Sequence, residues 1–307
     1  MRFRNVGWVL ALPLLAAAPA QAGDKQVDCD KPGQTISKGL HTLMPGETLT
    51  VRGTCREFVV LPEEMQRIRL DGGGTASIQP PAPTSSAVLI RGQGITLTGF
   101  RITGGFNGVL VRNGASALLA GNSIQGNERD GLVVIENASA SVTNNAIRDN
   151  GRFGILVSES ANLRLGILNL AVGELPVGGA GPNTIENNGS DGVQVLRSSS
   201  AVLVQNRIAD NGRHGVSVLQ NAHALLAGNT LDANSQDGIL VGDGSGVNLG
   251  TGSTSNPEDQ LNHTTSANGG FGIRCFVYSY ARGGLGMLNG AAGAKSFTPI
   301  CFDGMLP

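Results

Sequence analysis

A short pattern of asparagine and glycine returns along most of this chain at a fixed spacing. Each full copy has an Asn, a second Asn five residues later and a Gly four residues after that, followed by an aliphatic run. Successive steps between these glycines are 23, 23, 38, 23, 23 and 34 residues, at Gly108, Gly131, Gly154, Gly192, Gly215, Gly238 and Gly272. The long steps are one period plus 15 or 11 inserted residues. A period in this range indicates a solenoid.

The aliphatic runs predict strands with one inward face. Residues alternate across a strand, so Leu132 and Val134 point one way and Val133 and Ile135 the other. The columns equivalent to Leu132 and Val134 are apolar in every copy. Two more apolar columns follow in each period: Leu119, Val142, Leu165, Leu203, Leu226 and Leu249, then Ile124, Ile147, Ile185, Ile208 and Leu231. Three short strands per period, with no 3.6-residue periodicity, predict an all-β parallel β-helix rather than an α-solenoid.

The repeated asparagines favour a structural role. Asn tolerates the left-handed backbone conformation and bonds nearby backbone, so a turn repeated in every coil selects it. Stacked copies can then bond side chain to side chain along the axis. One column of these asparagines is Asn122, Asn145, Asn183, Asn206 and Asn229. Its next expected copy falls on His263, with Asn262 beside it, which leaves the register there open by one residue.

The repeat can be written N-x-I-x-x-N-x-x-x-G-I-x-V, as in Asn145 to Val157. It resembles the PbH1 repeat of the right-handed parallel β-helix superfamily, which includes pectate-lyase-like enzymes. The resemblance covers roughly Val88 to Phe276. It implies the fold and says little about activity, because one fold hosts many functions.

Residues 1–22 have the features of a secretory signal: Arg2 and Arg4, an apolar stretch, and Ala20-Gln21-Ala22 before Gly23. We therefore predict a secreted or periplasmic protein. No later segment reaches the roughly 20 apolar residues of a membrane helix, so we predict no membrane span. The periodicity predicts one domain over 23–307, with an N-terminal cap and first coils over 23–84, regular coils over 85–276 and a C-terminal cap over 277–307.

Four cysteines follow the leader, and four cysteines allow three pairings. We favour Cys29 with Cys55 and Cys275 with Cys301, because each pair brackets an end of the solenoid where stacking alone cannot complete the core. A metal site would need CxxC or Cys/His clustering, which the sequence lacks. We predict no metal.

Charge argues against nucleic acid as a partner. Without the leader, 20 Lys and Arg stand against 23 Asp and Glu, a net charge of −3. A phosphate-binding face needs clustered Lys and Arg in excess.

Polysaccharide-active β-helix enzymes, by resemblance, place catalytic groups on the outer face of the sheet that contains the Gly-Ile-x-Val strand. Lyases there need clustered acids for Ca²⁺ and a basic residue, and hydrolases need two or three carboxylates. The outward positions of this chain are mostly apolar, for example Leu110, Val133, Leu156 and Leu240. We predict no cofactor; Ca²⁺ is left open as the alternative, although no motif supports it.

A polar column does precede these strands. One residue before each glycine stand Asn107, Asp130, Phe153, Asp191, His214, Asp237 and Phe271, and we call this column the polar strip. Stacking would place His214 between Asp191 and Asp237, which makes these three the candidate catalytic residues for acid/base work on a uronate sugar. The candidate substrate-binding residues are Asp130, Arg129, Arg152 and Arg213. A solvated turn is the competing explanation, because Asp and Asn are favoured before Gly.

The outward positions also predict an exposed apolar stripe, formed by Leu110, Val133, Ile135, Leu156, Leu196, Leu219 and Leu240. Soluble monomers seldom leave such a stripe in water. Two covers are open: the insertion from Ile167 to Pro182, or an interface with another copy or another exported protein.

Three functions are consistent with these observations. The first is a non-catalytic exported protein that recognises an extracellular or envelope polysaccharide or a protein partner. The second is a lyase, epimerase or hydrolase acting on an acidic glycan at an atypical site around His214. The third is metal handling, like that of the periplasmic copper-associated β-helix proteins, for which His214, His223 and His263 lack ligand spacing.

Overall fold

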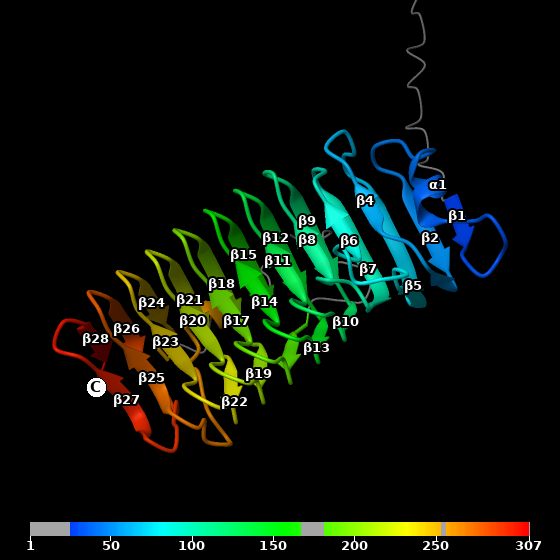
Figure 1. Cartoon of the computed structure of the whole chain (residues 1–307). Helices are drawn as coiled ribbons and strands as arrows, with labels where there is room; N and C mark the ends of the chain where they lie inside the picture. The colour runs from blue at the N-terminus through cyan, green and yellow to red at the C-terminus, as the bar shows by residue number, and fades with distance from the viewer. Residues whose placement is uncertain (1–24, 167–180, 253–255, 307) are drawn as a thin grey trace, which may run out of the picture.

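The computed structural model shows a rod of stacked β-coils (Figure 1). It describes residues 25–166, 181–252 and 256–306, so the predicted signal segment 1–22 lies outside the described residues. Coils repeat about every 23 residues, and strand register follows the sequence period: Leu132 pairs with Val109 and with Ile155. Across both long steps Val193 pairs with Ile155, and Ile273 with Ile239. The predicted parallel β-helix is confirmed.

The first strand of each coil belongs to a ten-stranded parallel sheet, which we call the ten-stranded sheet. Its strands are β4 (Val59–Leu61), β6 (Val88–Ile90), β8 (Val109–Val111), β11 (Leu132–Val134), β14 (Ile155–Val157), β17 (Val193–Val195), β20 (Val216–Val218), β23 (Ile239–Val241), β25 (Phe271–Cys275) and β27 (Gly293–Phe297).

The remaining strands form a second, 18-stranded parallel sheet that contains the other two strands of each coil. Its N-terminal part consists of β1 (Lys25–Asp28), β2 (Thr48–Arg52), β3 (Thr54–Cys55), β5 (Arg69–Ile78) and β7 (Ile95–Ile102). Strand β1 pairs with β2, and both β2 and β3 pair with the long strand β5. Strand β5 pairs with β7, which in turn pairs with β9 (Ser116–Ala120) and β10 (Ser123–Gln125) of the next coil. The second strands are β9 (Ser116–Ala120), β12 (Ser139–Thr143), β15 (Asn162–Gly166), β18 (Ser200–Val204), β21 (His223–Ala227), β24 (Gly246–Leu249), β26 (Tyr280–Gly284) and β28 (Phe302–Leu306). The third strands are β10 (Ser123–Gln125), β13 (Ala146–Arg148), β16 (Thr184–Glu186), β19 (Arg207–Ala209) and β22 (Thr230–Asp232).

The predicted apolar columns fill one continuous interior. Leu132, Val134, Val142 and Ile147, from the three strands of one coil, are all fully buried, as are their equivalents in the neighbouring coils. Glycine opens the strand because a Cβ on Gly131 would come within 2.6 Å of both the Gly154 carbonyl oxygen and the Ile147 side chain. The core therefore depends on the period rather than on any single segment.

Two buried ladders of asparagine side chains run along the rod, as predicted. In each, Nδ2 of one Asn donates to Oδ1 of the Asn in the next coil. The ladders are Asn122, Asn145, Asn183, Asn206, Asn229 and Asn262, and Asn127, Asn150, Asn188, Asn211, Asn234 and Asn268. Asn262, not His263, continues the first ladder.

The sequence analysis attributed these asparagines partly to a left-handed backbone conformation, and for the ladder positions this is wrong. Left-handed φ falls one residue before the ladder, at Asp149, Asn187 and Asp210, for example. The ladder asparagines instead accept backbone N–H groups: Asn188 Oδ1 accepts from the N–H and the Nδ2 of Asn150, at 3.2 and 2.9 Å. The side-chain amide selects Asn at these positions, because it bonds both backbone and the next rung.

Both predicted disulfides are present, between Cys29 and Cys55 and between Cys275 and Cys301. At the N-terminal end, helix α1 (Ile36–Leu40) packs Ile36 and Leu40 into the core. The 3-10 helix η1 (Pro257–Asp259) lies within the second insertion. No helix among the described residues is long and apolar enough to cross a membrane.

Candidate functional site

The polar strip lies at the N-terminal ends of the strands of the ten-stranded sheet, with one residue per coil. Backbone bonds set this register: the N–H of each repeat glycine donates to the carbonyl of the strip residue in the next coil, as from Gly192 to His214 and from Gly215 to Asp237. The structure therefore stacks Asp191, His214 and Asp237 on successive coils, as the sequence predicts. Whether they act on a substrate stays a prediction.

Asp191 is 0% exposed and every contact of its carboxylate is internal. Oδ1 accepts the backbone N–H of His214 at 3.1 Å. Oδ2 accepts the hydroxyl of Ser217 at 2.7 Å and the side-chain amide of Gln194 at 3.1 Å. Ser217 and Gln194 are outward residues of β20 and β17, which the sequence analysis did not assign to the site. The signal for them was their outward position beside the strip.

Asp237 is equally buried and holds the ring of His214. Nδ1 of His214 lies 3.2 Å from the Asp237 backbone nitrogen and 3.3 Å from Asp237 Oδ2. Oδ1 accepts the N–H of Phe271 at 2.8 Å and contacts Arg274 at 3.1 Å. Burial raises the pKa of Asp237, but the bonds from His214 and Phe271 and the charge of Arg274 outweigh it and hold the pKa below its ordinary value.

Asp130 forms a separate ion pair with Arg152. The guanidinium Nε and Nη2 of Arg152 lie 2.8 and 2.6 Å from the two carboxylate oxygens, a bidentate geometry. Asp130 also accepts the N–H of Phe153 at 3.1 Å. Arg129 stays 3.7 Å from the same carboxylate, and its guanidinium lies 5.5 Å from the ring centre of Phe106. Asp130 is thus neutralised by Arg152 and is only 1% exposed, whereas the Arg129 side chain is 43% exposed.

Arg213, a candidate substrate-binding residue, directly precedes His214 in the chain, and its role in binding stays a prediction. Arg213 is exposed, and its backbone bonds to Ser190 and Gln236 in adjacent coils. Arg274 supplies the cation of the cluster. It comes from the coil after the second insertion, and its guanidinium also lies 5.1 Å from the ring centre of Phe271.

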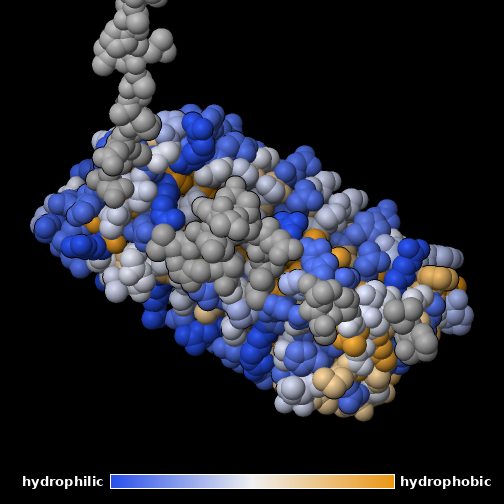
Figure 2. Space-filling model, turned by 180° about the vertical axis from the view of Figure 1, so that it is seen from behind, coloured by the Kyte–Doolittle hydropathy of each residue, from blue (hydrophilic) through white to orange (hydrophobic). Residues whose placement is uncertain are grey.

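The predicted apolar stripe is less exposed than expected. Val133 and Leu240 are buried, and the other five members are half-buried. Parallel coils lie only about 4.8 Å apart, so outward side chains of adjacent coils cover one another. The insertion proposed as a cover falls on residues 167–182, most of which lie outside the described residues. Large exposed apolar side chains occur near the C-terminal end instead, including Tyr278, Met287 and Phe302, and Figure 2 shows apolar surface gathered there.

The fold defines a parallel β-helix protein with a polar strip beside one sheet. The chain belongs to the NosD family, because the model of that family, described as periplasmic copper-binding protein (NosD), matches residues 66–256. This confirms the predicted location, secreted or periplasmic. A search of curated proteins gave no match.

Solved structures with the same fold include carbohydrate-active enzymes. The enzymatically active domain of bacteriophage CBA120 tailspike protein 2 has a TM-score of 0.62 and 12% identity over 84% of this chain, which spans 43% of that domain. Pectate lyase Pel9A gives 0.54 and 14%, with 90% and 80% of the two chains covered. Alginate lyase from Paenibacillus sp. str. FPU-7 gives 0.52 and 15%, with 90% and 99% covered. At these identities the likeness concerns the fold alone.

The family's description raises the question of copper. Copper sites are built from converging imidazole, thiolate or thioether donors. Among the described residues, which include every His and Cys, only Cys29, Cys55 and Glu57 bring three His, Cys, Asp or Glu donor atoms within 4.8 Å of one another. Both sulfurs are held in the disulfide.

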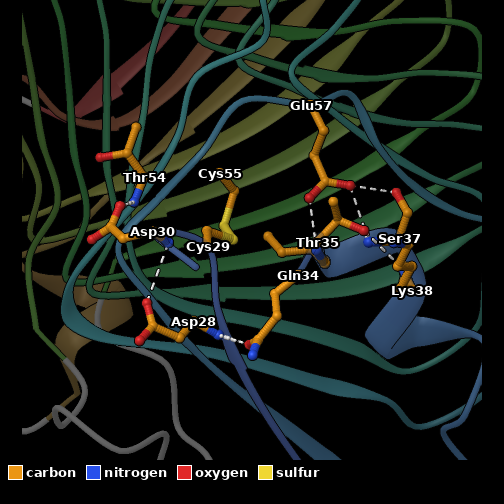
Figure 3. The surroundings of a disulfide bond; sticks show 11 residues. Asp28, Cys29, Asp30, Gln34, Thr35, Ser37, Lys38, Thr54, Cys55 and Glu57 are labelled. Carbon is orange, nitrogen blue, oxygen red and sulfur yellow. Dashed lines mark hydrogen bonds between the residues drawn. A yellow bond between two sulfur atoms is a disulfide. The ribbon is translucent and has the colours of Figure 1, made fainter. Parts of the chain in front are cut away.

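Glu57 is also engaged, as Figure 3 shows. Its two carboxylate oxygens accept the N–H groups of Ile36 and Ser37 at 2.6 and 3.0 Å, together with the Ser37 hydroxyl, and so bind the start of α1. The predicted histidine donors are dispersed: Nδ1 of His214 contacts Asp237, and Nε2 of His263 lies 2.8 Å from the Thr230 hydroxyl. The His, Cys, Asp and Glu donors of the described residues therefore do not fit a copper centre.

Proposed function

We propose that this protein is a non-catalytic recognition protein that binds an acidic extracellular or envelope polysaccharide along the outer face of the ten-stranded sheet. One observation carries the proposal: the acids of the polar strip are buried, and Asp130 and Asp191 bond both carboxylate oxygens internally, whereas arginines beside them face solvent. Asp237 bonds Oδ1 in the same way, while its Oδ2 lies 3.3 Å from Nδ1 of His214 without a hydrogen bond among the described residues. Asp130, Asp191 and Asp237 are each at most 1% exposed. A buried carboxylate whose oxygens are already bonded is poorly placed to bind Ca²⁺ or to transfer a proton to a sugar.

The arginines have a spacing that suits a polymer. Arg129 and Arg152 occupy adjacent coils, and Arg213 lies two coils further on, because Ser190 occupies the coil between. Adjacent coils are separated by about 4.8 Å, which is comparable with the length of one sugar unit in an extended chain. Guanidinium groups bind carboxylates in a bidentate geometry. Arg152 is already paired with Asp130, so Arg129 and Arg213 are the exposed arginines that can bind the carboxylates of an acidic polysaccharide chain.

The fold neighbours support polysaccharide as the ligand class, because pectate lyase and alginate lyase are named for acidic polymers. The second candidate function is catalysis on such a polymer around His214, Asp191 and Asp237, and the stacking of these residues favours it. Their burial opposes it: His214 is 3% exposed and packed between two carboxylates.

Calorimetric titration with polygalacturonate, alginate and neutral dextran tests the proposal. We expect binding of the acidic polymers that weakens with added salt, no binding of dextran and no unsaturated product absorbance. Replacing Arg129 and Arg213 together by Gln should weaken binding. Arg148→Gln, a partly exposed arginine on the other sheet, is the matched control. Product formation that His214→Ala abolishes would favour the enzyme instead, and equal binding by the double variant and the control would refute the proposed face.

A further inference from the structure

A shallow hollow of about 240 Å³ lies on the outer face of the ten-stranded sheet, over β8, β11 and β14. Its apolar part is formed by four stripe residues, Leu110, Val133, Ile135 and Leu156. Polar residues line it on both sides: Asn107, Arg129 and Asp130 near the strand starts, and Ser158, Glu159 and Arg197 past the strand ends. The hollow therefore combines an apolar floor with polar rims, the usual composition of a small-molecule site.

Two residues that line the hollow each have a buried side-chain oxygen without a hydrogen-bond partner among the described residues. Oδ1 of Asn107 and Oγ of Ser158 are buried and make no hydrogen bond among the described residues. Asn107 is 9% exposed and Ser158 2% exposed. The other end of the Asn107 amide is occupied, since Nδ2 donates to Ser86 Oγ at 3.2 Å. Buried polar groups are nearly always paired, so these two oxygens point to a ligand that brings hydroxyl groups.

Of the arginines at the hollow, one has no carboxylate that compensates its charge. Arg152, outside the hollow, forms the bidentate pair with Asp130. Arg197 lies 3.3 Å from Glu159 and is compensated by it. The ion pair of Arg129 among the described residues is the 3.7 Å contact with the already neutralised Asp130, and its guanidinium also lies over the neutral ring of Phe106. The hollow therefore offers a single uncompensated guanidinium, which suits one carboxylate.

We propose that this hollow is a subsite for one hexuronic acid unit, which deepens the proposed function and rests on it. The sugar carboxylate pairs with Arg129. Sugar hydroxyls donate to Asn107 Oδ1 and exchange a hydrogen bond with Ser158 Oγ. The apolar face of the pyranose ring lies on Leu110, Val133 and Leu156. A neutral hexose of the same configuration keeps the hydroxyl contacts and loses the ion pair.

The test is titration, followed by NMR, with disaccharides of galacturonate, glucuronate, mannuronate and guluronate and with their neutral hexose counterparts. At least one acidic disaccharide should bind, and its neutral counterpart should bind about tenfold more weakly or worse, which is the loss of a charged hydrogen bond. Arg129→Gln should cause the same loss for the acidic sugar. Ser158→Ala should weaken both sugars about fivefold, as expected for one neutral bond. Arg148→Gln should leave binding unchanged.

The outcomes separate the two proposals. If wild-type protein binds an acidic polymer and Arg129→Gln and Ser158→Ala bind it equally well, the subsite is refuted while the recognition function stands. Failure of every uronate, polymeric or disaccharide, refutes both. Equal affinity for acidic and neutral disaccharides refutes the role of Arg129. Unchanged circular dichroism and melting temperature of each variant ensure that a loss of binding is not a loss of fold.

Discussion

At the scale of single residues, the molecule uses buried polar side chains as structural partners. Asn188 Nδ2 bonds the carbonyl of Ile147 and the next rung, while its oxygen accepts two donors of Asn150. Each such side chain replaces bonds that backbone would otherwise make to water. Removing one leaves its neighbours buried and unpaired, which costs more than the bond itself contributes.

Asn188→Ala should therefore be strongly destabilising. The donors of Asn150 would lose their acceptor, and we expect the free energy of unfolding to fall by about 3 kcal/mol. The matched control is Asn162→Ala, an exposed asparagine on β15, for which we expect a change within about 0.5 kcal/mol. Denaturant titration measures both. Similar values for the two variants would mean that the ladder contributes little.

The environment of Asp232 predicts that the free energy of unfolding depends on pH. Burial raises the pKa of Asp232, but the N–H and hydroxyl of Thr265, the N–H of Ser266 and the charge of Arg207 outweigh it and lower the pKa. A carboxylate with a lowered pKa stabilises the fold above its unfolded pKa, near about 3.9, and loses that contribution as pH falls through the folded value. Asp232→Asn should cost about 1.5–3 kcal/mol at neutral pH.

The deficit of Asp232→Asn should narrow as both proteins are acidified below the unfolded pKa. Denaturant titrations over a pH series give this difference directly. A deficit that stays constant with pH would show that the hydrogen bonds of Asp232 do not depend on its charge.

At the scale of elements, the two ends of the rod are closed by different devices. Helix α1 covers the N-terminal end, and its first turn is bound by Glu57. The C-terminal end finishes in β27 and β28, each of which has a partner on one side only. Each end also has one disulfide, and both close the same separation of 26 residues.

This equal separation makes the disulfides a matched pair. Chain entropy alone predicts a loss of about 3 kcal/mol for replacing either pair by alanine. Because no helix of the described residues covers the C-terminal end, Cys275→Ala with Cys301→Ala should cost more than Cys29→Ala with Cys55→Ala. Thermal unfolding of the two double variants measures the difference. A larger loss at the N-terminal end would contradict the capping role of α1.

Elements were predictable from sequence wherever the period held. The inward columns and the stacking of His214 between two acids follow from constant 23-residue steps. Arg274 was missed as a partner of Asp237, because a side-chain contact across the second insertion depends on rotamers that periodicity does not fix. Helix α1 was missed because it lies in the N-terminal segment, where no repeat provides a register. The solvent exposure of the apolar stripe was overestimated, because its residues were considered singly and not as neighbours that cover one another.

At the scale of the whole molecule, each coil contacts mainly its two neighbours. Stability in such an array is a sum of local terms, and opening begins at the ends. Hydrogen exchange should therefore be fastest in β1, β27 and β28 and slowest in the central coils from β11 to β20. Mass spectrometry of exchanged peptides resolves this gradient. Uniform protection along the rod would indicate a single cooperative unit.

The side-chain amides of both ladders all face the same way along the axis, and the Nδ2 of each donates to the Oδ1 in the following coil. A duplicated coil inserted in register would continue both ladders, and a deleted one would rejoin them. Molecules of this design can thus lengthen or shorten by whole coils while keeping every internal bond type. Under the proposed function, the number of sugars that one copy spans would then change through gene duplication, independently of how well the proposed subsite fits.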